Sequence, residues 1–165
     1  CYLLSVGIES GDQEILRRCN KNYHLERVVE GLHLIKSLGF HVHGTFAFGL
    51  PGETRETVEK TIALAKRLQP TTVQFSTVIP YPGTAIYEHF KTQGYLLTED
   101  WDQYMAGCSI FEYPHLPARQ LDAAIKRAYR QYYFRPGYFP TGLKQLCQEP
   151  RRTLLNLVRL IRFSW

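Results

Sequence analysis

The chain has 165 residues, 44% of them hydrophobic, with four cysteines and a formal net charge of +5. This length supports one domain with a hydrophobic core, and the chain contains neither an apolar run long enough to span a bilayer nor a signal-peptide pattern. Because the cysteines lack C-x-x-C pairs and zinc-finger spacing, we exclude a metal motif of the chain's own and expect reduced, mostly structural thiols in a cytoplasmic protein.

The first 95 residues alternate between strand and helix patterns. Apolar and β-branched runs predict strands at residues 2–8, 40–49 and 72–79. Each strand is followed by a predicted helix with an N-cap side chain and an apolar stripe. The helical signals are Ser10 and Asp12 before a helix through Cys19, then Val28, Val29, Leu32, Ile35 and Leu38 with Gly39 as the C-cap, then Thr54 to Pro70, and finally Thr84 to Lys91.

Strands joined by helices of this length form right-handed βαβ units in a parallel sheet. Three units do not close a barrel, so we predict an α/β fold in the form of a truncated TIM-like barrel. The chain begins at Cys1 and enters a strand almost at once. We therefore expect a fragment of a longer protein, with an open edge on the first strand unless missing chain covers it.

The pattern changes after Trp101. Residues 99–116 are aromatic and irregular, and a helix is predicted from Ala118 to Phe134, stopped by Arg135-Pro136-Gly137. A last helix is predicted from Thr153. We divide the chain into a barrel segment, residues 1–97, and an aromatic-rich, basic helical extension, residues 98–165.

The basic charge lies in the tail. Residues 1–115 carry 10 Lys/Arg and 13 Asp/Glu, whereas residues 116–165 carry 10 and 2. The last helix could place apolar residues on an anionic membrane with arginines at phosphate level, or dock on the protein's own barrel. We disfavour nucleic acid, because no groove-reading or base-stacking motif accompanies the charge. The apolar residues in question are Leu154, Leu155, Val158, Ile161 and Trp165.

All three predicted strands of the barrel segment end in turns rich in Gly or Pro. These turns are Gly7-Ile8-Glu9-Ser10-Gly11, Phe46-Ala47-Phe48-Gly49-Leu50-Pro51-Gly52-Glu53-Thr54 and Pro80-Tyr81-Pro82-Gly83-Thr84. Sparse side chains let a backbone approach a ligand closely, and ligands in α/β sheets gather beyond the carboxyl ends of the strands. We therefore predict one shared small-molecule site.

Among the residues of these turns, Glu9 carries the most specific functional signal. Its carboxylate follows an apolar strand and could accept two hydrogen bonds from the hydroxyls of a ribose, with the Ser10 hydroxyl nearby. The alternative is that Glu9 or Ser10 simply caps the next helix.

The other two turns carry less specific signals. The amides of the turn from Gly49 to Thr54 could hold an anionic or polar group, while Glu53 is either a solvated first-turn carboxylate or a ligand contact. The turn from Pro80 to Thr84 offers Tyr81 as a platform and carbonyls for an amino group such as that of adenine, or else is a stiff connection.

Two further groups have plainer interpretations. His41 and His43 share a strand face, but without a third ligand we expect hydrogen-bonded or packed histidines. An aromatic group could line a pocket, although packing of the helical extension is the favoured role. Its members are Tyr129, Tyr132, Tyr133, Phe134, Tyr138 and Phe139.

Over residues 2–95 the chain resembles the second half of a radical S-adenosylmethionine (SAM) enzyme core. The resemblance rests on Gly7 to Gly11, on Gly44 to Thr54, and on Gln74-Phe75-Ser76 leading into the turn from Pro80 to Thr84. The segments Trp101…Tyr104 and Tyr129 to Pro136 are similar to the tail of the cobalamin-binding subgroup.

The resemblance implies half of a partial (β/α)6 barrel, with SAM and a 4Fe–4S cluster at the carboxyl ends of the strands. Gly7, Glu9 and Ser10 would face the ribose or methionine part of SAM, and the adenine side would be bordered by Phe48, Gly49, Leu50, Pro51, Pro80, Tyr81, Pro82 and Gly83. The implied chemistry is reductive cleavage of SAM to a 5′-deoxyadenosyl radical, which in the cobalamin subgroup often precedes methyl transfer or rearrangement of a small-molecule substrate.

The chain departs from the family pattern in one respect. No three cysteines form C-x-x-x-C-x-x-C. The cluster ligands and any cobalamin domain are thus expected upstream, in the missing amino-terminal half of the same protein, and the chain alone is expected to be inactive. The alternatives are an ordinary barrel lyase or isomerase with Glu9 as general base, and a non-catalytic module on a membrane surface.

Overall fold

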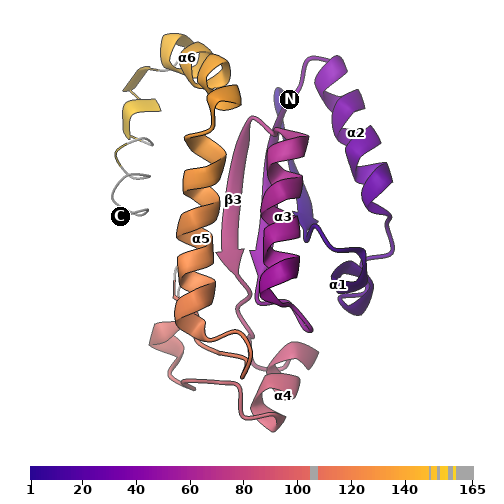
Figure 1. The fold of residues 1–165 in the computed structure, drawn as a ribbon, viewed down its shortest axis with the longest axis vertical. Coiled ribbons are helices and arrows are strands. Elements are labelled where there is room, and N and C mark those ends of the chain that lie inside the picture. The colour runs from indigo at the N-terminus through magenta and orange to yellow at the C-terminus, as the bar shows by residue number, and fades with distance from the viewer. Residues whose placement is uncertain (105–107, 149, 152, 156–157, 159–165) are drawn as a thin grey trace.

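The computed structural model describes residues 1–104, 108–148, 150–151, 153–155 and 158. Its strands are β1 (Leu3–Glu9), β2 (His41–Phe48) and β3 (Thr72–Thr77), and they form one parallel sheet in the order β1-β2-β3 (Figure 1). This arrangement confirms the predicted βαβ units and the parallel sheet.

Helices connect and flank the strands. They are α1 (Gln13–Arg18), α2 (Leu25–Ser37), α3 (Arg55–Leu68), α4 (Ala85–Thr92), α5 (Ala118–Tyr133) and α6 (Phe139–Gln148), with short 3-10 turns at Trp101–Gln103 and Pro136–Tyr138. Asp12, Thr54 and Thr84 accept backbone hydrogen bonds as N-caps, as predicted. The predicted apolar stripe of α2 is wrong at one position, because the Leu38 side chain is 66% exposed.

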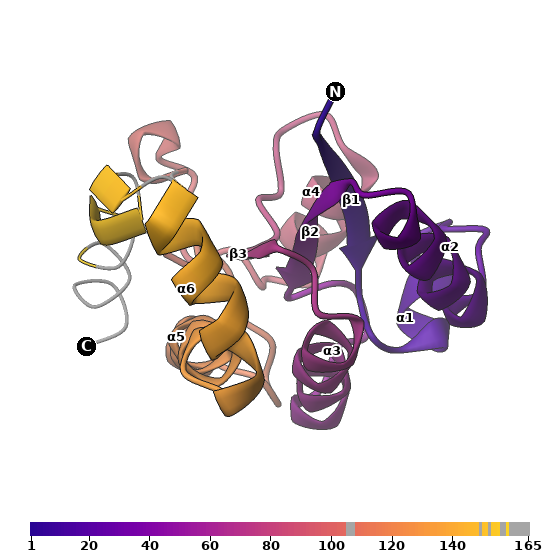
Figure 2. The same ribbon diagram turned by 90° about the horizontal axis from the view of Figure 1, so that it is seen from above.

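The two faces of the sheet differ in their surroundings. One face carries Val42, Phe46 and Phe48 of β2 and Val73 and Phe75 of β3, all buried. In Figure 2, α3 lies on this side of the sheet and α5 lies beside β3. α4 lies beyond the carboxyl ends of the strands (Figure 1).

The opposite face is open and polar. In-register partners place its side chains in rows across the strands, one row being Ser5, His43 and Thr72 and the next Gly7, Thr45 and Gln74. All six residues are exposed or half-buried. A closed barrel fills the same face with bulky branched side chains, so this face is built to contact something other than a hydrophobic core.

One hydrophobic cluster runs from Ile8 to Tyr132 and includes residues on both sides of residue 97. Leu121, Ile125 and Ala128 of α5 are buried in it, as their helical spacing predicted. The helical extension as far as α5 therefore packs directly on the barrel segment. The division of the chain between residues 97 and 98 stays a prediction.

Two tyrosines of α5 cover the outer edge of β3. The backbone N–H of Val73 donates to the hydroxyl of Tyr133 (3.1 Å), which donates to the Val73 carbonyl (3.4 Å); Tyr129 and Phe75 make the same pair of bonds at 3.1 and 3.3 Å. Four helical residues rise about 6 Å and two strand residues about 6.6 Å, so the hydroxyls match alternate strand residues. They act in place of a fourth strand.

Tyr132 and Tyr138 of this group also pack rather than line a pocket. Tyr132 donates to the Pro70 carbonyl, and the Arg135 guanidinium lies 4.0 Å from the Tyr132 ring centroid. Packing is thus confirmed as the role of the group, except for Phe134 and Phe139, which are exposed.

The sequence reasoning missed α6. Its first turn contains Pro140 and its second contains Gly142, residues that usually interrupt helices, but Pro is tolerated in a first turn because its missing N–H has no helical partner there. The predicted last helix falls largely outside the described residues: of its apolar residues, Leu154, Leu155 and Val158 are described and exposed.

All four cysteines are free. Cys1, Cys108 and Cys147 are exposed and only Cys19 is partly buried, so the expectation of mostly structural thiols is wrong. Within the described part of the chain, no helix combines the length and the apolar character needed to cross a membrane.

Candidate functional site

Glu9 ends β1 with its carboxylate on the open face of the sheet. A Cβ built on Gly7 would lie 3.0 Å from Oε1 of Glu9 and 3.7 Å from Oγ1 of Thr45, so the carboxylate occupies space that a side chain at residue 7 would fill. Glu9 has φ +64°, a left-handed conformation that non-glycine residues rarely adopt, and the pairing of β1 with β2 shifts between Gly7 and Glu9. Such backbone strain clusters at ligand sites.

The carboxylate of Glu9 is partly engaged but still accessible. Nζ of Lys21 lies 3.3 Å from Oε1, and the Glu9 side chain is 27% exposed. The Tyr23 hydroxyl donates to the Ile8 carbonyl (2.9 Å), which ties the loop after α1 to the end of β1. Glu9 does not cap α1, since Asp12 does so.

Ser10 points away from the open face. It is fully buried, and its hydroxyl lies 3.4 Å from Oγ1 of Thr61 on α3 while accepting the N–H of Asp12 (3.2 Å). Gly11 packs directly against α3, because a Cβ on this residue would lie 2.5 Å from the Lys60 carbonyl oxygen. Ser10 therefore anchors the turn to α3, and only its backbone could take part in a ligand contact.

The turn after β2 is closed by Glu53. This side chain is fully buried, and its carboxyl group accepts the backbone N–H groups of Gly49 and Leu50. Neither predicted role of Glu53, solvated residue or ligand contact, is correct. The prediction of free amides is also wrong for Gly49 and Leu50, whose amides are directed at Glu53.

Burial dominates the electrostatics of Glu53. Desolvation raises the pKa of Glu53, and the hydrogen bonds from the two amides lower it. The resulting pKa is about 8. Oε1 has no hydrogen-bond partner among the described residues. Burial thus favours the protonated form of Glu53, and its carboxyl group holds the turn in shape through the two amides.

Side chains from the extension complete the support of this turn. The Tyr113 hydroxyl donates to the Gly49 carbonyl (3.0 Å), Nε2 of His115 lies 2.9 Å from the Glu53 carbonyl, and the Phe111 ring lies beneath Gly49. Burial raises the pKa of Tyr113 well above its usual range. Sequence reasoning missed these three contacts, since nothing in the local pattern of residues 99–116 links them to residue 49.

The turns after β2 and β3 are built alike. Leu50-Pro51-Gly52-Glu53 and Tyr81-Pro82-Gly83-Thr84 each have Pro at the second position, Gly at the third with φ +83°, and a closing bond from the fourth N–H to the first carbonyl (2.9 and 3.1 Å). These are the features of a type II turn. Each leads into an N-cap threonine, so the two loops present similar backbone at neighbouring strand ends.

An aromatic group lies beside the second turn. The rings of Tyr81 and Tyr104 have centroids 6.4 Å apart, as do those of Tyr104 and Trp101. Tyr81 is 54% exposed and Trp101 68%, so both offer ring surface to a ligand. The sequence indicated Tyr81 as a ligand platform, whereas Trp101 and Tyr104 entered only through the resemblance to the cobalamin-binding subgroup.

The predicted binding residues thus divide into two groups. Gly7, Glu9, Pro51, Tyr81, Pro82 and Gly83 are exposed or half-buried, whereas Ser10, Phe48, Gly49, Leu50 and Pro80 are buried. Phe48 belongs to the helix-covered face of the sheet. Buried members shape the turns from behind, and the exposed ones are those that can touch a ligand.

The two strand histidines are hydrogen-bonded, as predicted. Nδ1 of His43 lies 2.7 Å from Oγ1 of Thr72, and Nδ1 of His41 lies 3.4 Å from Oγ1 of Thr71. Over residues 1–104 and 108–148 and the few later residues described, no three His, Cys, Asp or Glu side chains are placed to hold a metal ion. The described residues therefore do not fit a 4Fe–4S cluster.

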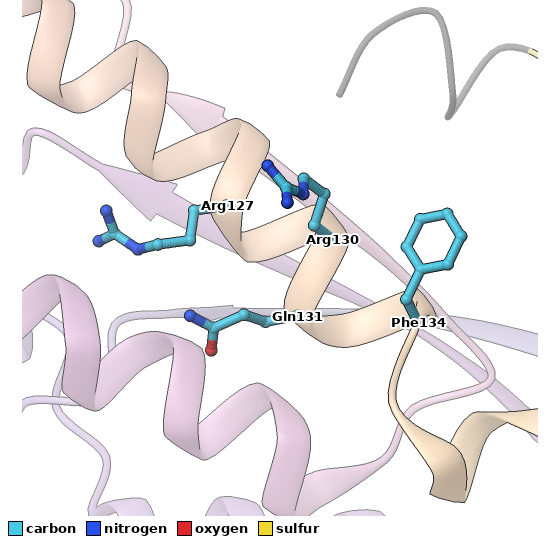
Figure 3. Close-up of a pocket in the computed structure, with 4 residues that line it drawn as sticks. All are labelled: Arg127, Arg130, Gln131 and Phe134. Carbon is cyan, nitrogen blue, oxygen red and sulfur yellow. The ribbon is translucent and has the colours of Figure 1, made fainter. Parts of the chain in front are cut away.

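Depressions also occur on the helix-covered side. Figure 3 shows one depression of about 520 Å3, which is lined by Arg127, Arg130 and Gln131 of α5 and by Phe134 just after it. Arg127 pairs with Glu59 of α3, and Lys66 donates to Gln131 (2.9 Å). The depression therefore lies on the surface of α5, away from the open face that carries Glu9.

Comparison with known proteins identifies the fold and the family. Residues 3–65, which contain β1, β2 and the Glu53 turn, match the family model of the radical SAM superfamily. The chain belongs to the radical SAM superfamily. A solved radical SAM structure, coproporphyrinogen III oxidase (HemN) from Escherichia coli, aligns with a TM-score of 0.54 at 19% identity over 81% of this chain and 26% of that one. It supports the partial barrel.

Among the relatives, an uncharacterized methyltransferase of Pyrococcus horikoshii is 34% identical over 136 residues, which is 82% of this chain and 30% of the relative. A bacteriochlorophyllide d C-8(2)-methyltransferase of Chlorobaculum tepidum is 24% identical over 99% of this chain and 36% of its own length. The chain thus spans about a third of the length of each of these two relatives.

Proposed function

We propose that this chain forms part of the SAM-binding wall of a longer radical SAM enzyme, whose cluster-binding cysteines lie outside these 165 residues. The observation that carries the proposal is the Glu9 carboxylate, held over Gly7 on the open polar face at the carboxyl end of β1. A carboxylate in this position can accept hydrogen bonds from both hydroxyls of a ribose.

The residues present fit one side of a SAM molecule. Gly7 leaves room for the carboxylate, and the exposed ring of Tyr81 beside the Pro82-Gly83 turn offers stacking surface for an adenine. The buried Glu53 and Tyr113 hold the Gly49–Leu50 backbone at the neighbouring strand end. When bound next to its cluster, SAM would supply a 5′-deoxyadenosyl radical for hydrogen abstraction.

The polar rows of the open face would then face the substrate. Ser5, His43, Thr45 and Gln74 carry hydrogen-bonding groups, and the open face lacks the apolar filling of a closed barrel. We therefore propose that substrate is held beneath SAM by hydrogen bonds. The names of the two relatives favour methyl transfer as the overall reaction, with cobalamin as an additional cofactor bound elsewhere in the full-length protein.

The decisive experiment uses the full-length protein reconstituted anaerobically with iron and sulfide. With SAM and a strong reductant we expect 5′-deoxyadenosine, measured by chromatography, and we expect none from the 165-residue chain treated in the same way. A full-length protein that holds its cluster but releases no 5′-deoxyadenosine would rule out the proposal.

The cobalamin part needs a separate measurement. The full-length protein purified from cells supplied with cobalamin is expected to retain it in stoichiometric amount, visible in the absorption spectrum. Absence of bound cobalamin together with intact SAM cleavage would remove the methyl-transfer proposal and leave the SAM site standing.

A further inference from the structure

In contrast to helices α1 to α5, the helix α6 has exposed apolar residues on one side and half-buried polar residues on the other. Its polar and small residues Thr141, Gly142 and Gln145 are half-buried, whereas the apolar residues on its other side are exposed. A helix of a globular protein usually buries its apolar stripe against the core. The orientation of α6 therefore calls for a different partner on its apolar side.

Hydrogen bonds hold α6 in this orientation. Nε2 of Gln145 and the hydroxyl of Tyr138 both donate to the carbonyl of Thr71 at the start of β3, at 3.3 Å each, and the same hydroxyl lies 3.1 Å from Oε1 of Gln145. Tyr138 ends the 3-10 turn just before α6 and Gln145 lies on α6, so the start of the helix and the side that carries Gln145 are both held at this carbonyl. This side is fixed to the sheet, and the opposite side must face outward.

The outward side forms an apolar stripe of Phe139, Leu143 and Leu146, at the spacing i, i+4, i+7. Their exposed fractions are 71%, 64% and 37%. Phe134, Leu154 and Leu155 near the two ends of α6 are also at least half exposed. Single exposed leucines are ordinary, but a group of this size marks an interaction surface.

Charge indicates the chemistry of the partner. Residues 134–165 contain six Lys or Arg and one acidic residue, Glu149. Lys144, next to Leu143 on α6, and Arg151, three residues after the end of α6, are exposed. Apolar side chains rimmed by cations on a short helix are the features of a segment that lies in the interface of an anionic bilayer.

We propose that α6 binds the surface of an anionic membrane, with Phe139, Leu143 and Leu146 inserted among the lipid chains and Lys144 and Arg151 at the lipid phosphates. In Figure 1, α6 lies near the amino-terminal start of β3, and the turns after β2 and β3 lie at the other end of the sheet. Membrane contact there leaves the carboxyl ends of the strands free, so it is independent of the proposed SAM site.

The test is co-sedimentation of the full-length protein with vesicles of phosphatidylcholine alone or mixed with phosphatidylglycerol. We expect binding to the mixed vesicles that weakens as salt is added, and little binding to phosphatidylcholine alone. The double variant Phe139→Gln with Leu143→Gln is expected to lower the partition coefficient about tenfold or more, since it removes two inserted side chains.

A matched control comes from α2, where Leu34 and Leu38 are 61% and 66% exposed. The pair Leu34→Gln with Leu38→Gln removes similar apolar area from another helix and is expected to leave binding unchanged. Replacing Lys144 and Arg151 by Glu should abolish the preference for phosphatidylglycerol. Circular dichroism of each variant checks that the fold is retained.

Three results would overturn the proposal. One is a wild-type protein that stays in the supernatant with both vesicle types. The second is equal loss of binding in the α2 control. The third is a dimer in light scattering that the α6 variant dissociates while vesicles bind neither form, which would assign the stripe to a second copy of the chain.

Discussion

Oε1 of Glu9 lies only 3.0 Å from where a Cβ on Gly7 would stand, so the glycine and the carboxylate share one small volume on the open face of the sheet. Residue 7 is itself exposed, which means that a larger side chain there would compete with Glu9 for the same surface. The conformation of the Glu9 carboxylate is thereby tied to the absence of a side chain two residues earlier.

Gly7→Ala and Glu9→Gln should each weaken SAM binding to the full-length protein. The alanine methyl group displaces the carboxylate. Glutamine removes the negative charge, and without this charge the hydrogen bonds to the hydroxyl groups are weaker. Losing such bonds is expected to raise the Kd about tenfold or more. Isothermal titration under anaerobic conditions measures the Kd, and Glu30→Gln on α2 is a surface control. Unchanged affinity in both variants would exclude Glu9 from the SAM site.

The buried acid Glu53 should make stability depend on pH. Its pKa is raised from the ordinary 4.5 to about 8 in the folded protein, so between these values the unfolded chain has released a proton that the folded one keeps. The stabilisation is fully present below pH 4.5 and is lost as pH rises through about 8. The slope approaches about 1.4 kcal/mol per pH unit in this window.

Comparison with Glu53→Gln isolates this contribution. Urea unfolding at several pH values should give a free energy of unfolding that falls more steeply with pH in the wild type than in the variant. Glu59→Gln, at an exposed position of α3, should keep the wild-type slope. Parallel profiles for wild type and Glu53→Gln would mean that Glu53 titrates near its ordinary pKa.

Removing the hydroxyls of Tyr129 and Tyr133 should uncover the edge of β3. Tyr→Phe keeps both rings but leaves the backbone groups of Val73 and Phe75 without these partners, at about 1–3 kcal/mol of unfolding free energy for each site. Faster hydrogen exchange of the two strand amides would report the local effect. Tyr95→Phe serves as control, because no described residue bonds its hydroxyl, and it should change neither quantity.

Two glycines with the same backbone conformation should respond differently to alanine. Gly49 and Gly83 have φ +82° and +83°, but a Cβ on Gly49 would meet the Phe111 ring at 2.4 Å, while nothing lies within 4 Å of one on Gly83. Gly83→Ala should cost about 1–2 kcal/mol for the left-handed conformation alone. Gly49→Ala should cost clearly more, measured by chemical denaturation. Equal losses would show that the turn moves freely away from Phe111.

Much of the fold follows from local patterns. The three strands, the caps at Asp12, Thr54 and Thr84 and the α5 stripe depend on side-chain periodicity and on hydrogen bonds between residues a few positions apart. α6 escaped prediction because Pro140 and Gly142 resemble helix breakers. Its position depends instead on Gln145 reaching Thr71, which is 74 residues earlier.

The candidate site shows the same division. The glycines, prolines and Glu9 could be placed at strand ends because parallel strands bring their carboxyl ends together. The direction of each side chain could not, as Ser10 and Glu53 demonstrate: both are polar residues in exposed-looking turns, yet both are fully buried.

The sequence by itself thus determined the parallel α/β architecture, the three turns and the radical SAM resemblance, since these rest on short-range periodicity and turn chemistry. Only the tertiary structure decided that Glu9 faces the open side, that Glu53 closes its own turn, and that tyrosines 54 and 60 residues away cover β3. These side-chain directions and contacts depend on which distant groups exclude water from a polar atom. The desolvation energy of that atom therefore cannot be inferred from its neighbours in the sequence.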